Sequence, residues 1–207
     1  FVHFIFMVHP KTERTLVIVK PDGVQRSLIG EMISRYERIG LKLVGIKMII
    51  PTPELVERHY LADPNWRMTV GAKTLAAYEK KGETPPSTDP LVIGETILQM
   101  VKNYITTGPV VPMVWEGVHA VEVVKKITGG TEPRTSDVGT IRGDFMLDSY
   151  PLSDGDKRAI RNLVHISGSV GDAAIEIPVW FTKDELLDYK HVQERILYDL
   201  DMGGILE

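Results

Sequence analysis

Thr15-Leu16-Val17-Ile18-Val19 is the stretch of sequence that decides the fold. An unbroken run of aliphatic and β-branched side chains has no polar face, which is typical of a central strand covered on both sides. The run stops at Lys20-Pro21-Asp22-Gly23, where proline and glycine predict a turn. Outward from this point, the rest of the chain must therefore supply partner strands and covering helices.

Helices and strands alternate along the chain that follows. Apolar residues at helical spacing end at Gly40, and prolines close the next strand at Pro51 and Pro53. The expected elements are helix 28–39, strand 41–50, helix 54–60, strand 109–115, helix 119–127 and strand 162–165. This order, with little linker, predicts an α+β fold in which helices pack on a small antiparallel sheet.

Two stretches interrupt the alternation and are predicted to be insertions in one domain spanning 1–207. The first, about 61–92, contains an expected helix at 70–81 and then a Pro- and Gly-rich loop at 82–90. The second, about 146–161, is also rich in turn residues. Residues 1–12 are expected to form an N-terminal extension. Its apolar start is too short, and lacks the basic leader, for a secretory signal, and we expect it to pack on a sheet edge or a neighbouring subunit.

Composition excludes several function classes. With 207 residues, of which 43% are hydrophobic, the chain can bury a good core. It contains no cysteine, which rules out disulfides and Cys-based metal or nucleophile chemistry and fits the cytoplasmic location that we expect. The net charge of −4 gives no basic field for a nucleic acid, and no apolar run is long enough for a membrane span. We therefore expect no specific nucleic-acid partner and no membrane association.

The sequence lacks the usual phosphate-binding and metal-binding motifs. Gly71-Ala72-Lys73-Thr74 does not have the glycine spacing of a P-loop, and no Gly-x-Gly-x-x-Gly follows a strand. There is no His-Glu-x-x-His, and Asp154-Gly155-Asp156 does not fit a calcium loop. A phosphate site would have to be built from side chains.

One histidine stands at a position that suits a nucleophile. Asn162-Leu163-Val164-His165 is a short apolar run, and Ser169-Val170-Gly171-Asp172 has the spacing of a capping box. The helix that begins there is expected to run to Ile177 and to end at Pro178. A helix N-terminus beside His165 would favour a neutral ring and a nearby anion, and Glu176 could orient the second ring nitrogen. The other reading is that His165 merely ends a buried strand.

Three cations could complete a phosphate site around His165. They are Lys20 at the end of the central strand, Lys125 on the helix 119–127, and Arg142 in Gly139-Thr140-Ile141-Arg142-Gly143-Asp144-Phe145. Each alone fits an ordinary surface charge. Together with a nucleophile they meet the needs of phosphoryl transfer, which are positioned cations around an in-line attack.

Five blocks of sequence, in order, resemble the nucleoside diphosphate kinase family. They are Lys20-Pro21-Asp22-Gly23-Val24-Gln25-Arg26, Gly108-Pro109-Val110-Val111, Val114-Trp115-Glu116-Gly117, Gly139 to Phe145, and Asn162-x-x-His165-x-Ser167. The resemblance covers the chain from about Glu13 to Tyr189. It implies a ferredoxin-like βαββαβ sandwich with a four-stranded antiparallel sheet, and usually a hexamer.

The resemblance also implies an activity and roles for single residues. The activity is ping-pong transfer of the γ-phosphate from ATP or another nucleoside triphosphate to a nucleoside diphosphate, through a phosphohistidine on His165. Mg²⁺ would arrive on the nucleotide rather than in a cage of protein ligands. Glu176 and Ser167 would orient His165. The phosphates would contact Arg142, Thr131 and Lys125, and the ribose and phosphate end would contact Asn162 and Lys20, the latter steadied by Tyr60.

Four positions depart from the family pattern. Lys125 stands where arginine is usual, Ile166 where glycine or alanine is usual, and Gly168 where aspartate is usual. The phenylalanine that stacks on the base falls in the disturbed region, where simple spacing puts Ile97, and Trp66 is a possible substitute. The base is expected to stack on apolar side chains without being identified by polar groups.

Three other functions fit parts of the pattern. A non-catalytic relative with a regulatory role could bind nucleotides, although the chain keeps His165, Glu176, Arg142 and Lys20 together. A histidine phosphatase usually begins with Arg-His-Gly, which the chain lacks. A nucleic-acid module of the same fold class would need exposed aromatics on a strand or a basic face.

Overall fold

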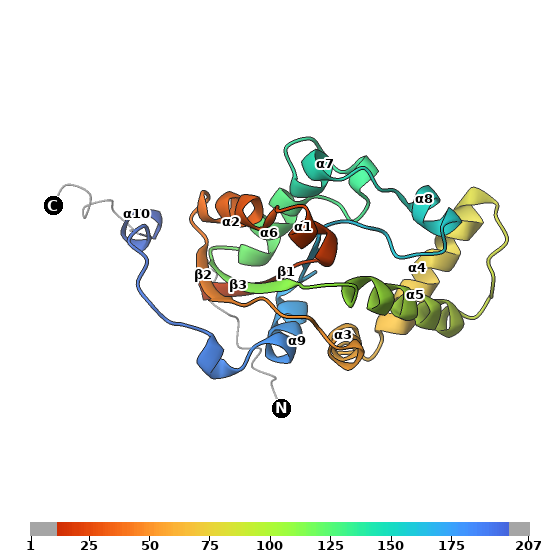
Figure 1. The fold of residues 1–207 in the computed structure, drawn as a ribbon, viewed down its shortest axis with the longest axis horizontal. Coiled ribbons are helices and arrows are strands. Elements are labelled where there is room, and N and C mark those ends of the chain that lie inside the picture. Colours follow the sequence, from red (N-terminus) through yellow and green to blue (C-terminus); the bar gives the residue numbers. More distant parts are fainter. Residues whose placement is uncertain (1–11, 199–207) are drawn as a thin grey trace, which may run out of the picture.

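A four-stranded antiparallel sheet forms the centre of the computed structural model, which describes residues 12–198. Figure 1 shows the sheet between helices. The strand order is β2-β3-β1-β4. The strands are β1 (Glu13–Val19), β2 (Lys42–Ile46), β3 (Val111–Gly117) and β4 (Val164–Ile166). This is the ferredoxin-like arrangement, so the predicted fold class is confirmed. The predicted N-terminal extension lies, apart from Thr12, outside the described residues.

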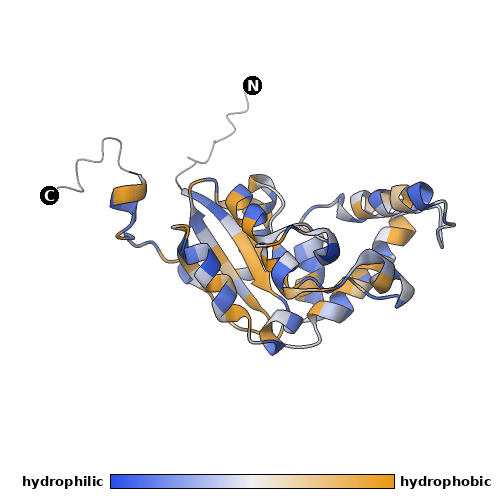
Figure 2. Cartoon of the chain, turned by 90° about the horizontal axis from the view of Figure 1, so that it is seen from above, coloured by the Kyte–Doolittle hydropathy of each residue, from blue (hydrophilic) through white to orange (hydrophobic). Residues whose placement is uncertain are grey.

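The two faces of β1 enter two different hydrophobic cores, as the unbroken apolar run predicts. Val17 and Val19 belong to one core, and Leu16 and Ile18 belong to the other. Figure 2 shows the hydrophobic residues along the central strands. The covering helices are α2 (Ile29–Glu37) and α6 (Ala120–Thr128) on the first face, and α3 (Pro53–Tyr60), α5 (Pro90–Ile105) and α9 (Val170–Trp180) on the second.

Two predictions based on proline were wrong. The expected turn after Lys20 is the start of a short helix, α1 (Pro21–Gln25), because proline at the first helical position loses no hydrogen bond. Pro178 lies inside α9 instead of ending it. The helix passes it because only one internal N–H is lost, and Phe181 N–H still donates to the Ile177 carbonyl at 2.9 Å.

The strand expected at 41–50 is shorter than predicted. The pairing register of β2 with β3 shifts between Leu43 and Gly45, and the strand ends at Ile46. Pairing resumes as a single bridge between Ile49 and Val110. A bulge of this kind bends the chain locally, which the apolar pattern alone does not reveal.

The first predicted insertion contains α4 (Trp66–Lys81), the predicted loop, and the start of α5, and α4 and α5 form a helical hairpin. The helix expected at 70–81 begins four residues earlier. Two glycines allow the backbones of α4 and α5 to come into contact. A Cβ on Gly71 would lie 1.8 Å from the carbonyl oxygen of Pro90, and a Cβ on Gly94 would lie 2.1 Å from the carbonyl oxygen of Arg67. Neither these helices nor any other within residues 12–198 is long and apolar enough to cross a membrane.

The second predicted insertion is closed by one buried carboxylate. It contains α8 (Tyr150–Gly155), and Asp148 binds Arg158 through two hydrogen bonds of 2.7 and 3.0 Å. The Arg161 N–H donates to the same side chain at 2.7 Å. These hydrogen bonds join the beginning of the segment to its end, and Asn162 follows that end directly.

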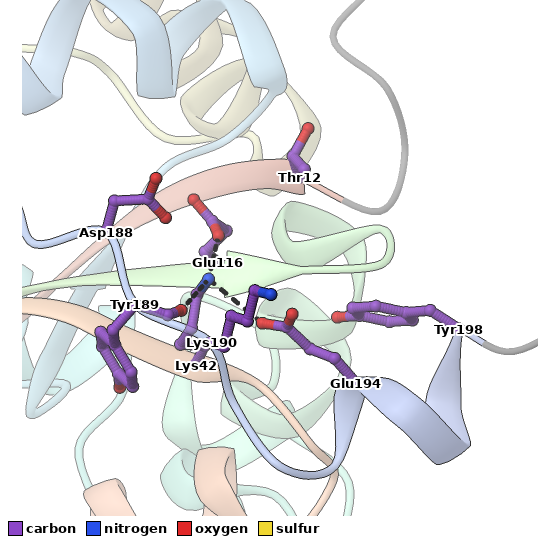
Figure 3. Close-up of a pocket in the computed structure, with 8 residues that line it drawn as sticks. All are labelled: Thr12, Lys42, Glu116, Asp188, Tyr189, Lys190, Glu194 and Tyr198. Carbon is purple, nitrogen blue, oxygen red and sulfur yellow. Dashed lines mark hydrogen bonds and ion pairs between the residues drawn. The ribbon is translucent and has the colours of Figure 1, made fainter. Parts of the chain in front are cut away.

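The C-terminal segment runs along the free edge of β2. The Leu187 N–H donates to the Val44 carbonyl at 2.8 Å, as an added strand would. Figure 3 shows the nearby pocket of about 490 Å³, in which the Lys42 ammonium contacts Glu116 at 2.7 Å, Glu194 at 3.2 Å and the Tyr189 carbonyl at 3.0 Å. This pocket lies at the opposite edge of the sheet from β4.

Candidate active site

His165 lies in the middle of β4, an edge strand paired with β1. Its partner across the ladder is Ile18, and directly paired residues project to the same face of a sheet. Because Ile18 enters the core beneath α3 and α9, the His165 ring points toward these helices. Its side chain remains 16% exposed, so it is accessible from solvent and does not simply end a buried strand.

A strained turn at Leu163 delivers the chain to His165. The Val164 N–H donates to the Asn162 carbonyl at 2.7 Å, and Leu163 between them has a φ of 67°. A hydrogen bond that spans one residue of positive φ defines a γ-turn, which is costly for a residue with a side chain. Burial of the Leu163 side chain holds the turn, and its carbonyl accepts the Lys20 N–H at 2.8 Å. The turn therefore ties the backbone of Lys20 to that of His165.

Glu176 of α9 holds the His165 ring. One carboxylate oxygen lies 3.4 Å from Nε2 of His165 and accepts the Ser167 hydroxyl at 2.6 Å. Ser167 in turn accepts the Leu16 N–H at 3.2 Å. Burial alone would raise the pKa of Glu176, but the His165 ring and the Ser167 hydroxyl outweigh it and lower that pKa to about 2. An ionised carboxylate here fixes the proton on Nε2 and leaves Nδ1 free for chemistry.

The partner of the ring comes from the middle of α9 rather than from its first turn. Ser169 does cap the helix, accepting the Asp172 N–H at 3.0 Å as the predicted capping spacing requires. His165, however, lies five residues before Val170, on the strand. Its orientation is therefore explained by Glu176, not by the dipole of the helix.

His59 is a site residue that the sequence did not reveal. It is buried on α3, and its ring meets the His165 ring edge to face, with 4.3 Å between centroids. The rings of Tyr60 and Trp180 also contact it, at 4.9 and 5.6 Å. Burial, and then the nearby His165, lower the pKa of His59 to about 3, so it is neutral. An isolated histidine on a short helix has no pattern that would have identified it.

Lys20, Asn162 and Thr131 form a chain of contacts. The buried Lys20 ammonium donates to the Asn162 side-chain oxygen at 2.7 Å, and the Asn162 amide donates to the Thr131 carbonyl at 2.9 Å. The Lys20 ammonium lies 5.3 Å from the centroid of the Tyr104 ring, a contact that the sequence did not predict. Burial, and then the charge of Arg142, lower the pKa of Lys20 to about 7.

Arg142 is buried and is held by backbone carbonyls. Its guanidinium donates to the carbonyls of Gly129, Gly130, Asn162 and Val164 at 2.6 to 3.2 Å. These bonds use four of its five N–H donors and leave one on Nη2. Burial lowers the pKa of Arg142 to about 10, which still leaves it charged at neutral pH. Carbonyl oxygens do not neutralise a cation, so an anion would be favoured beside it.

Lys125 on α6 contacts Gly168, which lies between β4 and α9. The exposed Lys125 ammonium donates to the Gly168 carbonyl at 2.9 Å. A Cβ on Gly168 would lie 2.8 Å from the Asp172 carboxylate, so Asp172 fills space next to the position where the family usually has aspartate. Ile166, the third departure near His165, packs its side chain against the core.

Two neighbouring aromatic rings lie where the base of a nucleotide is predicted to stack. Tyr60 lies 4.9 Å from Trp66, the first residue of α4, and 6.2 Å from His165, measured between ring centroids. Its predicted contact with Lys20 stays a prediction. Ile97, the position given by simple spacing, is half-buried on α5.

Comparisons with known proteins identify the family of the chain. The family model described as nucleoside diphosphate kinase matches residues 13–68 and 93–186. The chain belongs to the nucleoside diphosphate kinase family. The family model does not match residues 69–92, which fall in the first predicted insertion. Residues 146–161, the second predicted insertion, lie within the range that it matches.

Individual relatives match along nearly their whole length. The nucleoside diphosphate kinase of Pyrobaculum aerophilum is 43% identical over 180 residues, covering 85% of this chain and 98% of that protein. A crystal structure of the NDP kinase from that organism, 42% identical, has a TM-score of 0.81 and covers 86% of this chain and 100% of its own. A transition-state mimic of the Borrelia burgdorferi nucleoside-diphosphate kinase with bound vanadate and ADP is 37% identical, has a TM-score of 0.75 and covers 92% of this chain and 99% of its own.

Proposed function

We propose that this protein is an active nucleoside diphosphate kinase that transfers a γ-phosphate in two steps through His165. The observation that carries the proposal is the arrangement of His165, with Nε2 held by the ionised Glu176, on a strand end joined to Lys20 by the Leu163 turn. Within residues 12–198 neither of the buried cations Lys20 and Arg142 has a carboxylate within ion-pair distance, and Asp22 is the carboxylate whose nearby charge acts on Lys20, so both favour a phosphate. The vanadate and ADP complex of the Borrelia relative supports the same chemistry.

Both steps balance with the groups at hand. In the first, the Nδ1 lone pair of His165 forms an N–P bond to the γ-phosphorus while the bond from phosphorus to the β-phosphate oxygen breaks. The nucleoside diphosphate leaves with that electron pair, and the Nε2 proton stays directed at Glu176. In the second step an oxygen of another nucleoside diphosphate attacks the phosphohistidine and releases Nδ1. Charge on the transferring group is stabilised by the remaining N–H of Arg142, by Lys20 and by Lys125.

The substrates are proposed to be ATP and other nucleoside tri- and diphosphates. The CDP complex of the Halobacterium salinarum relative, 34% identical with a TM-score of 0.65, supports a nucleotide in this site. That relative is covered over 99% of its length and this chain over 91%. Mg²⁺ would enter as part of the substrate, because Mg²⁺ prefers oxygen ligands and is usually bound together with substrate phosphates. Trp66, with Ile97 as the other candidate, would contact the base.

The resemblance to the family also underlies two broader proposals. We expect a homo-oligomer, with a hexamer as the first model, and a cytoplasmic location. Sedimentation of the purified chain would test the first, and fractionation of cells that produce it would test the second.

One labelling experiment tests the activity. Incubation with ATP labelled on the γ-phosphate should give a phosphoprotein that is labile in acid and stable in base, as a phosphohistidine is. A nucleoside diphosphate should then remove the label and appear as labelled triphosphate. Labelling that persists in His165→Ala contradicts the assignment of the nucleophile. Nucleotide binding without labelling of the unaltered chain would support a non-catalytic relative instead.

A further inference from the structure

His59 has no part in the proposed transfer, yet it lies against the nucleophile. Within residues 12–198, neither of its ring nitrogens has a hydrogen-bond partner, although the side chain is 2% exposed. Buried polar groups in native proteins are nearly always paired, so two orphaned nitrogens at one position need an explanation. A bound water or an ion can supply the missing partner, and the neighbouring side chains favour an ion.

The surrounding groups match the donors of a transition-metal ion. His59, His165 and Glu176 each offer one ligand atom, and these atoms lie within 4.8 Å of one another. In a tetrahedral site with bonds of ~2.1 Å, ligand atoms are ~3.4 Å apart. Nε2 of His165 and the Glu176 carboxylate oxygen already have that separation, 3.4 Å. The His59 ring would have to move closer by at most about 1.4 Å.

We propose that His59, His165 and Glu176 form a binding site for a divalent transition-metal ion such as Zn²⁺, occupied when the enzyme carries no phosphate. Two imidazoles and one carboxylate are a known zinc ligand set that leaves the fourth position to water. The side chains of His165 and Glu176 are 16% and 14% exposed, which gives the ion a way in. Mg²⁺ would not compete, because it prefers oxygen ligands in octahedral geometry.

Such an ion would silence the nucleophile. A metal on Nε2 of His165 uses that lone pair, and the neutral ring then carries its proton on Nδ1. Nδ1 has no lone pair left for attack on phosphorus. The exchange moves one proton from Nε2 to Nδ1 and breaks the contact between Nε2 and Glu176. This inhibition rests on the proposed function, whereas binding of the ion does not.

The binding test uses the full chain without nucleotide. Calorimetry with Zn²⁺, and the visible absorption of Co²⁺ as a second probe, should detect one ion per chain at this site. His59→Gln and the isosteric Glu176→Gln should each weaken binding by about tenfold or more. His119→Asn is the matched control, since it removes an exposed histidine whose φ of 49° asparagine tolerates, and it should bind as the unaltered chain does. Binding that neither variant weakens, or no binding by the unaltered chain, overturns the site.

A second experiment measures the consequence for catalysis. One equivalent of Zn²⁺ added before Mg-ATP should reduce γ-phosphate labelling of the unaltered chain in proportion to metal occupancy. The same amount of Zn²⁺ should reduce labelling of His59→Gln much less, when labelling is compared with that of the same variant without metal. Full labelling of the metal-loaded chain overturns the inhibition. Absence of labelling without any Zn²⁺, with intact metal binding, would refute the proposed function and leave the metal site standing.

Discussion

Lys20 is an ammonium group held in a buried position by an amide oxygen and an aromatic ring, at 2.7 and 5.3 Å. Its lowered pKa of about 7 means that roughly half the molecules carry the charge at neutral pH. A phosphate beside it would favour the charged form. If the proposed site binds a nucleotide, the charge state of Lys20 would therefore depend on that binding.

The first prediction concerns the pH dependence that this causes. As pH rises through about 7, free enzyme loses the Lys20 proton, so kcat/KM for the nucleoside diphosphate should fall between pH 7 and 9. Asn162→Asp should place a negative charge at the Lys20 contact and move this fall to higher pH. Lys47→Gln, which alters a lysine paired with Glu185 at the sheet edge, is the control and should keep the profile. A kcat/KM that is constant from pH 6 to 9 would refute the role of Lys20.

The second prediction concerns Lys125, where the family usually has arginine. Lys125 donates to the Gly168 carbonyl and is exposed, so a guanidinium could keep this contact and add a second donor toward a phosphate. Lys125→Arg should raise kcat by about 2- to 10-fold, with a smaller change in KM, if the added donor acts on charge in the transition state. Steady-state kinetics measure this split. Unchanged kcat and KM would mean that the side chain lies outside the site.

At the scale of elements, α4 and α5 are joined by contact between backbones. Gly71 lies so close to the carbonyl of Pro90, and Gly94 so close to that of Arg67, that a Cβ would not fit at either position. Trp66, at the start of α4, is the ring that reaches Tyr60. The packing of this hairpin therefore sets where an aromatic ring stands at the base end of the site.

The third prediction tests that packing. Gly71→Ala should destabilise the protein by about 1–3 kcal/mol, because the added methyl must push the two helices apart. Gly30→Ala in α2 is the matched control, since nothing lies within 4 Å of its added Cβ. It should stabilise by about 0.5–1 kcal/mol, the helix preference of alanine over glycine. Urea unfolding measures both, and equal effects of the two substitutions would contradict the close approach.

Elements with their own periodicity could be predicted, and those set by distant contacts could not. The run at Thr15–Val19 predicted a strand buried on both sides, and that is confirmed by two separate cores. The helices at Pro21 and past Pro178 depend on which N–H groups remain bonded, which a proline in a sequence does not tell. His165, Glu176 and Ser167 were predicted and do meet. His59 and Tyr104 reach the site through tertiary packing of α3 and α5, so local patterns carried no sign of them.

For the whole molecule, the candidate active site places two cations in the interior. Lys20 and Arg142 are both buried, and the loss of water around each side chain lowers its pKa. The charge of Asp22 acts on Lys20, but no carboxylate forms a direct ion pair with either cation within residues 12–198, so we expect the fold to be more stable with an anion in place.

The fourth prediction follows. Pyrophosphate at about 100 times its Kd should add about 2.7 kcal/mol to the free energy of unfolding, which corresponds to a rise in Tm of about 5–10 °C. The rise should shrink at pH 9, where Lys20 has lost its charge, and in Lys20→Met at pH 7. Sodium chloride at the same ionic strength serves as control in calorimetric scans. A rise of equal size in Lys20→Met would show that the anion binds elsewhere.

The covering of β2 by the C-terminal segment has a consequence for biosynthesis. Tyr189, whose hydroxyl donates to the Leu43 carbonyl at 2.9 Å, leaves the ribosome 146 residues after its partner. Throughout that interval the nascent chain presents a strand edge with open N–H and C=O groups, the kind of edge that pairs with other chains. Slow translation of the part of the message between Leu43 and Tyr189 would lengthen this exposure, so the yield of correctly folded protein should depend on how quickly these residues are added.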